Sequence, residues 1–125
     1  MNLQGGCHCG AVRFSITADP PLDLLDCNCS ICAKTGYLHL NVPHDRFTLL
    51  SGAECLSPYR FGTAIAEHLF CKICGIKSFY QPRSHPECWS VNFRCLDAGH
   101  GLKPVISHFD GENWENAMKT LPKIP

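Results

Sequence analysis

Three of the ten cysteines in this sequence lie within six residues, at Cys27, Cys29 and Cys32. A cysteine thiolate binds zinc strongly and also acts as a nucleophile. A structural zinc normally takes four protein ligands, whereas a zinc that takes part in chemistry keeps three and leaves one position open. The central cluster supplies three thiols, so it predicts an open, catalytic zinc site.

Two further pairs of cysteines flank this cluster and together supply four thiols. The pairs are Cys7 with Cys9 and Cys71 with Cys74. Gly10 follows the first pair and frees the backbone to turn around an ion, and the second pair has the regular form CxxCG. Short cysteine motifs of this kind pair in space to close a tetrahedral site. The two pairs therefore predict a second, closed zinc site with a structural role.

The cellular compartment decides whether these thiols bind metal or form disulfides. The first six residues carry neither the basic nor the apolar region of a secretory signal, and no segment reaches the roughly 18 apolar residues of a membrane span. We therefore expect a cytoplasmic protein. In that reducing environment closely spaced cysteines bind metal more often than they form disulfides, so the sequence predicts two zinc ions per chain.

Composition and charge exclude several classes of partner. At 125 residues, 45% of them hydrophobic, the chain fits one zinc-binding domain over residues 1–125 that buries its own core. Eleven Lys and Arg residues balance eleven Asp and Glu residues. Neither nucleic acid nor a membrane is therefore an expected partner, and the sequence leaves the oligomeric state open.

The segments between the cysteine clusters are typical of short strands, because they are rich in β-branched and aromatic residues and are separated by Gly, Pro and Asp. Strands are predicted over residues 11–17, 22–26, 37–42, 47–50, 55–61, 64–70, 76–80, 88–94 and 104–109. The predicted fold class is mainly β. We expect a small zinc-stapled, β-sandwich-like domain of several short antiparallel sheets, with one or two short helical turns.

One of these helical turns is predicted at the central cluster itself. Ser30 and Lys34 are poor strand formers, and Gly36 is a natural helix stop. Such a turn places Cys29 and Cys32 on one face. The backbone N–H groups at its start point toward the thiolates and lower their pKa. A second turn is predicted over residues 116–121.

Five motifs are spread over nearly the whole chain. They are residues 6–14 (GCHCGAVRF), 27–32 (CNCSIC) followed by Lys34, 70–75 (FCKICG), 92–97 (NFRCLD), and Asp110-Gly111 with Trp114. Together they resemble the glutathione-dependent formaldehyde-activating enzyme family, which also includes centromere protein V. The sequence departs from the family at Asn28, where members often carry a histidine, but all seven expected zinc ligands are present.

The resemblance implies a metal-stapled, mostly β fold. It implies a structural zinc on Cys7, Cys9, Cys71 and Cys74, and a second zinc on Cys27, Cys29 and Cys32 near a thiol-binding cleft. It also implies a carbon–sulfur lyase that acts on a glutathione adduct, forming S-(hydroxymethyl)glutathione from formaldehyde and glutathione. The thiol of glutathione, with a pKa near ~8.5, would be deprotonated at the open position of a three-cysteine zinc. We therefore predict that the three central cysteines are catalytic.

Several polar residues are candidates for binding the substrate or moving a proton. Arg94 and Asn92 could hold a substrate carboxylate through charge-assisted hydrogen bonds, or could simply brace their strand. Lys34 lies close to the central cluster and could bind the substrate or offset the charge of the thiolates. His39 and His68 are candidates for proton transfer, although a single histidine is more often a packing or surface residue.

Three alternatives stay open at this stage. The central cluster could be a second structural zinc site, completed by Cys55, Cys88, Cys95 or a histidine. Because three thiolates make zinc a weaker Lewis acid, the chain could also bind a thiol or zinc without turnover. The third alternative is an interaction module, as the resemblance to centromere protein V allows. The neutral composition and the lack of a basic tail argue against acidic partners.

Overall fold

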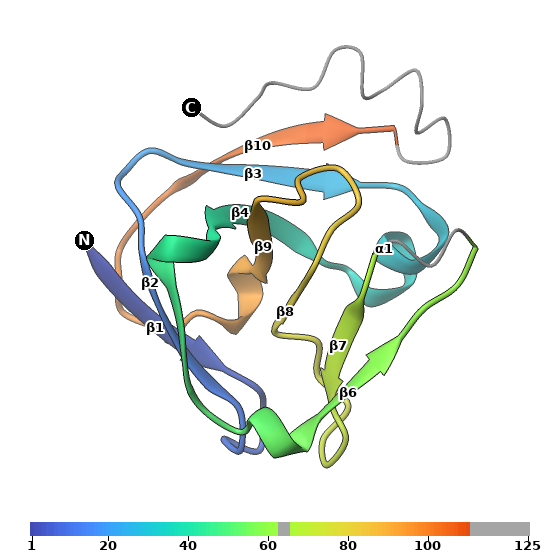
Figure 1. Cartoon of the computed structure of the whole chain (residues 1–125). Helices are drawn as coiled ribbons and strands as arrows, with labels where there is room; N and C mark the ends of the chain where they lie inside the picture. Colours follow the sequence, from blue (N-terminus) through green and yellow to red (C-terminus); the bar gives the residue numbers. More distant parts are fainter. Residues whose placement is uncertain (63–65, 111–125) are drawn as a thin grey trace.

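The computed structural model describes residues 1–62 and 66–110, and within them the chain is mainly β, as the sequence predicted (Figure 1). A first sheet has three antiparallel strands in the order β1-β2-β5. These strands are β1 (Asn2–Gly6), β2 (Arg13–Thr17) and β5 (Phe47–Ser51). Phe14 and Ile16 of β2 alternate with more exposed residues and are buried, because successive side chains of a strand point to opposite faces.

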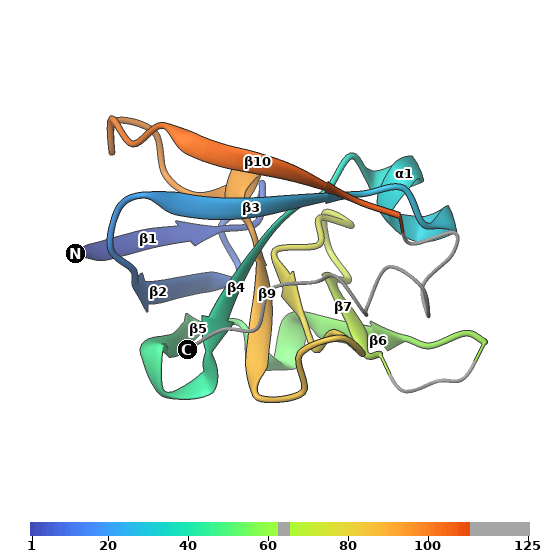
Figure 2. The ribbon, with the colours of Figure 1, turned by 90° about the horizontal axis from the view of Figure 1, so that it is seen from above.

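A second sheet has five strands in the order β10-β3-β4-β9-β8. They are β3 (Leu22–Cys27), β4 (Leu38–Pro43), β8 (Phe79–Tyr80), β9 (Cys88–Asn92) and β10 (Pro104–Phe109). Figure 2 shows β3 and β10 side by side, and the two strands are parallel. The prediction of antiparallel sheets differs from the structure at this pair, because β10 reaches β3 through a long connection and not through a hairpin.

A third sheet consists of two antiparallel strands, β6 (Leu56–Tyr59) and β7 (His68–Cys71). The helix α1 (Ser30–Thr35) follows soon after β3 and ends at Gly36, whose φ of 64° is a left-handed conformation that glycine adopts easily. Short 3-10 turns are η1 (His44–Arg46), η2 (Ala53–Cys55) and η3 (Phe93–Cys95). None of the helices in residues 1–62 and 66–110 has the length and apolar character needed to cross a membrane.

The predicted strands and the observed ones agree in position but differ in length. β10 covers the predicted residues, whereas β8 keeps only two of the five residues predicted over 76–80. The sequence did not predict β1, because Gly5 and Gly6 disfavour a strand. A Cβ atom on Gly5 would lie 2.4 Å from the carbonyl oxygen of Cys95, so close packing against η3 explains this glycine. The turn predicted over 116–121 lies outside the described residues.

The core lies between the first two sheets and is built on packed aromatic rings. The centroid of the Phe47 ring lies 5.7 Å from that of Phe14, 4.7 Å from that of Phe79 and 5.7 Å from that of Trp89. Phe14 and Phe79 are almost completely buried. Such pairs add to the stability that burial of their large apolar surface already provides. This core fixes the strands whose ends carry the cysteine clusters.

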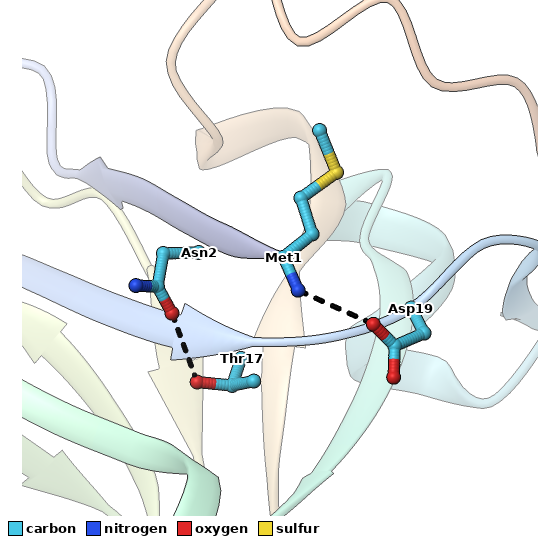
Figure 3. Close-up of polar contacts among 4 residues, drawn as sticks. All are labelled: Met1, Asn2, Thr17 and Asp19. Carbon is cyan, nitrogen blue, oxygen red and sulfur yellow. Dashed lines mark hydrogen bonds and ion pairs between the residues drawn. The ribbon is translucent and has the colours of Figure 1, made fainter.

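Two polar contacts at the start of the chain hold β1 against β2 (Figure 3). The amino group of Met1 donates to Asp19 Oδ1 over 3.2 Å, and the hydroxyl of Thr17 donates to Asn2 Oδ1 over 3.1 Å. Both contacts are exposed, so they contribute little to stability. Asn2 and Thr17 are also partners in the backbone pairing of β1 with β2, which carries the first cysteine pair to its position after β1.

Candidate functional site

The two flanking cysteine pairs meet in space and form a four-thiol cluster. The Sγ atoms of Cys7, Cys9, Cys71 and Cys74 all lie within 4.8 Å of one another. Cys9 Sγ lies 3.6 Å from Cys7 Sγ and 3.7 Å from Cys71 Sγ. Two sulfur atoms bound to one tetrahedral zinc, each about 2.3 Å from it, lie about 3.8 Å apart. The donor set and its spacing therefore fit a closed four-cysteine zinc site, as the sequence predicted.

Two tight turns bring these thiols together. Gly10, with a φ of 81°, follows the first pair, and Gly75, with a φ of 79°, follows the second. The Gly75 amide donates to the carbonyl of Cys71 over 2.7 Å, which closes the second turn. Figure 1 shows the loops that follow β1 and β7 along the same lower edge of the molecule, away from α1.

Backbone N–H groups in this cluster stabilise the deprotonated form of Cys74. Burial alone would raise the pKa of this thiol. Hydrogen bonds from the N–H groups of Cys9 and Ile76, and from the thiols of Cys7 and Cys71, outweigh burial and lower the pKa to about 6. Metal binding requires the thiolate, so the turn geometry favours the metal-binding form of Cys74, whereas contacts with the other three thiols raise the pKa of Cys9.

The central cluster is built where β3 ends and α1 begins. Cys27 is the last residue of β3, Cys29 precedes the first residue of α1, and Cys32 lies within the helix. The ligand atoms of Cys27, Cys32 and His39 all lie within 4.8 Å of one another. His39 lies on β4, opposite Leu25 of β3, and its Nε2 is 3.2 Å from Cys32 Sγ. Cys29 does not belong to this group, so the structure brings together two of the three predicted central cysteines and a histidine.

The pKa values of the three central thiols are shifted in opposite directions. Hydrogen bonds from the thiols of Cys27 and Cys32 lower the pKa of Cys29 to about 2, and the N–H groups of Cys32 and Ile31 at the start of α1 add to this effect. The pKa values of Cys27 and Cys32 are raised by the same contacts. The neighbouring thiols are the larger cause, and the start of the helix contributes to the thiolate character of Cys29.

His39 is buried and hydrogen-bonded on both ring nitrogens. Its Nδ1 lies 2.9 Å from the hydroxyl of Ser90 and 3.1 Å from the hydroxyl of Tyr80. Burial, followed by the charge of Lys77, lowers the pKa of His39 to about 3, so the ring is neutral. A nitrogen and a sulfur bound to one tetrahedral zinc would lie about 3.6 Å apart. The observed 3.2 Å is closer to an N–H···S hydrogen bond.

A cavity of about 540 Å³ opens beside the central cluster and not beside the four-thiol cluster. Its volume falls within the range of sites that bind small molecules. Cys27, Cys29 and Cys32 form one wall. Four other lining residues are Phe61, His68, Tyr80 and Arg83. Phe61 follows β6 and His68 begins β7. Tyr80 ends β8, and Arg83 lies in the loop after it.

The remaining predicted site residues lie elsewhere. Arg94 donates from Nε to the carbonyl of Gly36 over 3.2 Å, and Asn92 donates from Nδ2 to the carbonyl of Lys77 over 3.2 Å. Lys34 is exposed on α1. None of these three predicted residues lines the cavity, and their assignment to substrate binding stays a prediction. Of the residues considered for completing the central cluster, His39 reaches it, whereas Cys55, Cys88 and Cys95 belong to neither metal-binding group.

Sequence reasoning missed several cavity residues, among them Phe61, Tyr80 and Arg83. These residues belong to no sequence motif. The folding of the chain brings the loop after β8 and the helix α1 to the same cavity. His68 was considered for proton transfer, and the structure places it in the cavity wall. The pairing of His68 with Lys77, whose Nζ is 2.7 Å from His68 Nδ1, could not be seen in the sequence.

Comparisons with known proteins identify similar sequences and a similar fold. Residues 2–112 match the family model described as glutathione-dependent formaldehyde-activating enzyme. The chain is 42% identical over 121 residues to a Halomonas elongata protein whose name marks it as a candidate enzyme of this kind, and the match covers 90% of this chain and 77% of that protein. The crystal structure of a Rhodobacter sphaeroides protein is similar with a TM-score of 0.72 and 35% identity, covering 83% of this chain and 99% of that one.

Proposed function

The chain belongs to the glutathione-dependent formaldehyde-activating enzyme family, and from this premise we propose that it is a carbon–sulfur lyase. Its proposed substrate is glutathione or a glutathione adduct such as S-(hydroxymethyl)glutathione. The observation that carries the proposal is the position of the central thiols in the wall of a cavity of about 540 Å³. A small molecule can therefore reach these thiols.

We propose that Cys27, Cys29 and Cys32 hold one zinc ion and that the four-thiol cluster holds another. When bound at the central cluster, zinc supplies a positive charge that stabilises a thiolate at neutral pH. The proximity of Cys27 Sγ and Cys32 Sγ, which lie within 4.8 Å of each other, supports this assignment, and so do the contacts of Cys29 with both thiols. All ten cysteines are free thiols in the structure, which is consistent with a reducing compartment such as the cytoplasm.

We assign His39 as a hydrogen-bond donor to the sulfur of Cys32. The hydroxyls of Ser90 and Tyr80 both lie within hydrogen-bond distance of Nδ1. If both donate to Nδ1, the hydrogen of the neutral ring lies on Nε2, which faces Cys32 Sγ at 3.2 Å. A hydrogen bond to a thiolate withdraws some of its charge, so His39 offsets the excess of negative charge that three thiolates bring to one site.

The chemistry requires a thiolate and an electrophilic carbon to meet in the cavity. In the synthetic direction, the sulfur of the substrate thiolate attacks the carbonyl carbon of formaldehyde and forms the C–S bond. The π electron pair moves to the oxygen, which then takes up a proton equivalent to the one the thiol lost. In the reverse direction the hydroxyl loses its proton, the C–S bond breaks and the thiolate leaves. Both directions need the central thiols to hold the substrate sulfur and need the substrate oxygen to be held in a fixed position.

Arg83 gives the cavity a cationic residue that suits a substrate with carboxylates, as glutathione has. It lies in the loop that follows β8 and lines the cavity together with the thiols. A guanidinium group binds a carboxylate through paired hydrogen bonds. Arg83 is therefore proposed to hold a carboxylate of the substrate while the substrate sulfur lies at the central cluster.

The test of this function is Cys29→Ala. We expect the exchange between formaldehyde with glutathione and their adduct, measured by two-dimensional exchange NMR, to lose its acceleration by at least about 100-fold. The zinc of the four-thiol cluster and the circular dichroism of the fold should be retained. Cys55→Ala, which alters a thiol that does not line the cavity, is the matched control. Wild-type exchange rates in Cys29→Ala would contradict the proposal.

The proximity of His39 favours one alternative, a thiol- or zinc-binding protein without turnover. If His39 bound zinc as a fourth ligand, the central site would be closed and could not accept a substrate sulfur. Calorimetry would then show zinc or glutathione binding, while the exchange rate would stay at its uncatalysed value. A wild-type chain that accelerates the exchange excludes this alternative.

A further inference from the structure

A buried lysine and a buried histidine pair beside the cavity. Lys77 is 8% exposed and His68 is 6% exposed. Lysine is almost never buried without a partner of opposite charge, yet in residues 1–62 and 66–110 no carboxylate forms an ion pair with Lys77. Its Nζ instead lies 2.7 Å from Nδ1 of His68 and over the rings of Tyr80 and Tyr37, at 3.8 Å and 4.8 Å from their centroids.

This pairing fixes the position of the hydrogen on the His68 ring. An ammonium group has three donors and no acceptor, so Nδ1 of His68 must accept. In a neutral imidazole the other nitrogen, Nε2, then carries the hydrogen. Burial, followed by the charge of Lys77, lowers the pKa of His68 to about 4. The ring is therefore neutral at physiological pH, with Nε2–H as its donor.

The Nε2–H group of His68 is available to a molecule in the cavity. The ring is stacked between two aromatic rings, with centroids 5.4 Å from Phe61 and 4.6 Å from Tyr80. His68, Phe61 and Tyr80 all line the cavity that the central thiols also line. Nε2 has no hydrogen-bond partner among the described residues. If Nε2 were also fully buried, it would be a buried polar atom without a partner, but Ser78 Oγ is the one such atom among these residues. Solvent in the cavity therefore reaches Nε2.

We propose that His68 is a catalytic residue that donates a hydrogen bond from Nε2 to the substrate oxygen, and that Lys77 is a positioning residue that fixes this tautomer. The inference rests on the proposed function. When a thiolate attacks the carbonyl carbon, negative charge develops on the oxygen. A preorganised N–H donor at that point stabilises the charge as it forms. In C–S cleavage the same donor stabilises the alkoxide that precedes loss of the thiolate.

Two substitutions at His68 separate a donor from a purely structural ring. His68→Phe keeps a ring between Phe61 and Tyr80 but removes Nε2–H. We expect it to lower kcat about 100-fold with little change in KM, as loss of one such donor does in other enzymes. His68→Gln retains an amide donor and an acceptor for Lys77, and we expect it to recover kcat to within about 10-fold of the wild type.

A matched control and a double variant guard against effects on folding. His44→Phe changes a histidine that also packs on an aromatic ring, Trp89 at 5.0 Å, but does not line the cavity. It should leave kcat unchanged. If His68→Phe fails to fold because Lys77 loses its partner, the double variant His68→Phe with Lys77→Met removes both partners of the buried hydrogen bond. The double variant should fold and show the same loss of kcat.

A measurement without substrate tests the role of Lys77. The ¹⁵N shifts of His68 in the wild type should be those of a neutral ring protonated on Nε2, and Lys77→Met should shift them toward a mixture of tautomers. Protonation of wild-type His68 on Nδ1, or wild-type kcat in His68→Phe, overturns the inference. If the wild-type chain does not accelerate the exchange, the proposed function and the catalytic role of His68 fail together. Acceleration that His68→Phe leaves unchanged defeats the role of His68 alone.

Discussion

The two cysteine clusters of this chain contain the same residue type but differ in enclosure. The four-thiol cluster takes all its donors from two tight turns and does not line the cavity. The central cluster lies at the start of a short helix, faces the cavity and has a histidine at its edge. The comparison teaches that two groups of the same residue type can differ in access within one fold, and this difference is the basis for proposing a structural role for one and a catalytic role for the other.

The largest effect that tests this contrast is expected from Cys71→Ser. Cys71 is fully buried and ends β7. Loss of one thiolate should release the ion of the four-thiol cluster, and the free energy of unfolding should fall by about 4 kcal/mol or more, because binding of a structural zinc contributes directly to folding. Urea unfolding with zinc analysis measures both quantities. Cys55→Ser is the control, and a Cys71→Ser variant as stable as the wild type would show that the cluster is not a scaffold.

An intermediate effect is expected from His39→Phe, which tests whether the central cluster is open. If His39 is a hydrogen-bond donor to Cys32, the variant keeps two zinc ions per chain and loses about tenfold in exchange rate, as is typical of residues that support a metal ligand. Tyr80→Phe removes only one hydroxyl beside His39 Nδ1 and should have a smaller effect. A fall to one zinc per chain in His39→Phe would show instead that both clusters are closed.

The smallest effect is expected from Asp97→Asn, near the four-thiol cluster. Asp97 accepts two hydrogen bonds from Arg13, at 3.0 Å and 2.5 Å. This contact holds the pKa of Asp97 below its usual value. Because the pair is largely exposed, its loss should cost less than about 1 kcal/mol at pH 7. The difference between the free energies of unfolding of this variant and of Cys71→Ser compares the stability that metal binding contributes with the stability that a surface ion pair contributes.

The pH dependence of that small effect has a definite sign. A carboxylate whose folded-state pKa is lowered contributes stability above its unfolded-state pKa of about 3.9, and this contribution is lost as the pH falls through the folded-state value. Urea unfolding should therefore show the wild type and Asp97→Asn converging below about pH 4. Asp23→Asn, which alters an exposed carboxylate with no ion pair among the described residues, is the control. A difference that grows toward acid would contradict this account.

The local features of the fold could be predicted from the sequence. The cysteine spacing predicted the four-thiol cluster, and Gly36 predicted the end of α1, because a turn around an ion and a helix stop depend on a few neighbouring residues. β10 was predicted for the same reason. β1 was not, since its glycines are explained by close contact with η3, far away in the sequence.

The parts of the site that depend on tertiary structure could not be predicted. His39 reaches Cys32 because β3 and β4 pair with Leu25 opposite His39, and nothing in either segment alone specifies that register. Arg83 enters the cavity through a loop with no recognisable motif. The burial of Lys77 against His68 and two tyrosine rings follows from packing and has no signal in the sequence.

β7 begins at His68, in the cavity wall, and ends at Cys71, in the four-thiol cluster. Three steps along a strand span only about 10 Å, so one short strand joins the proposed structural zinc site to the ring that is proposed to contact the substrate. If that site holds zinc, loss of the ion would loosen β7 at Cys71 and misalign the ring of His68. Turnover would then decline when zinc is scarce even while the central thiols stay loaded, which would make catalytic output a gauge of metal supply.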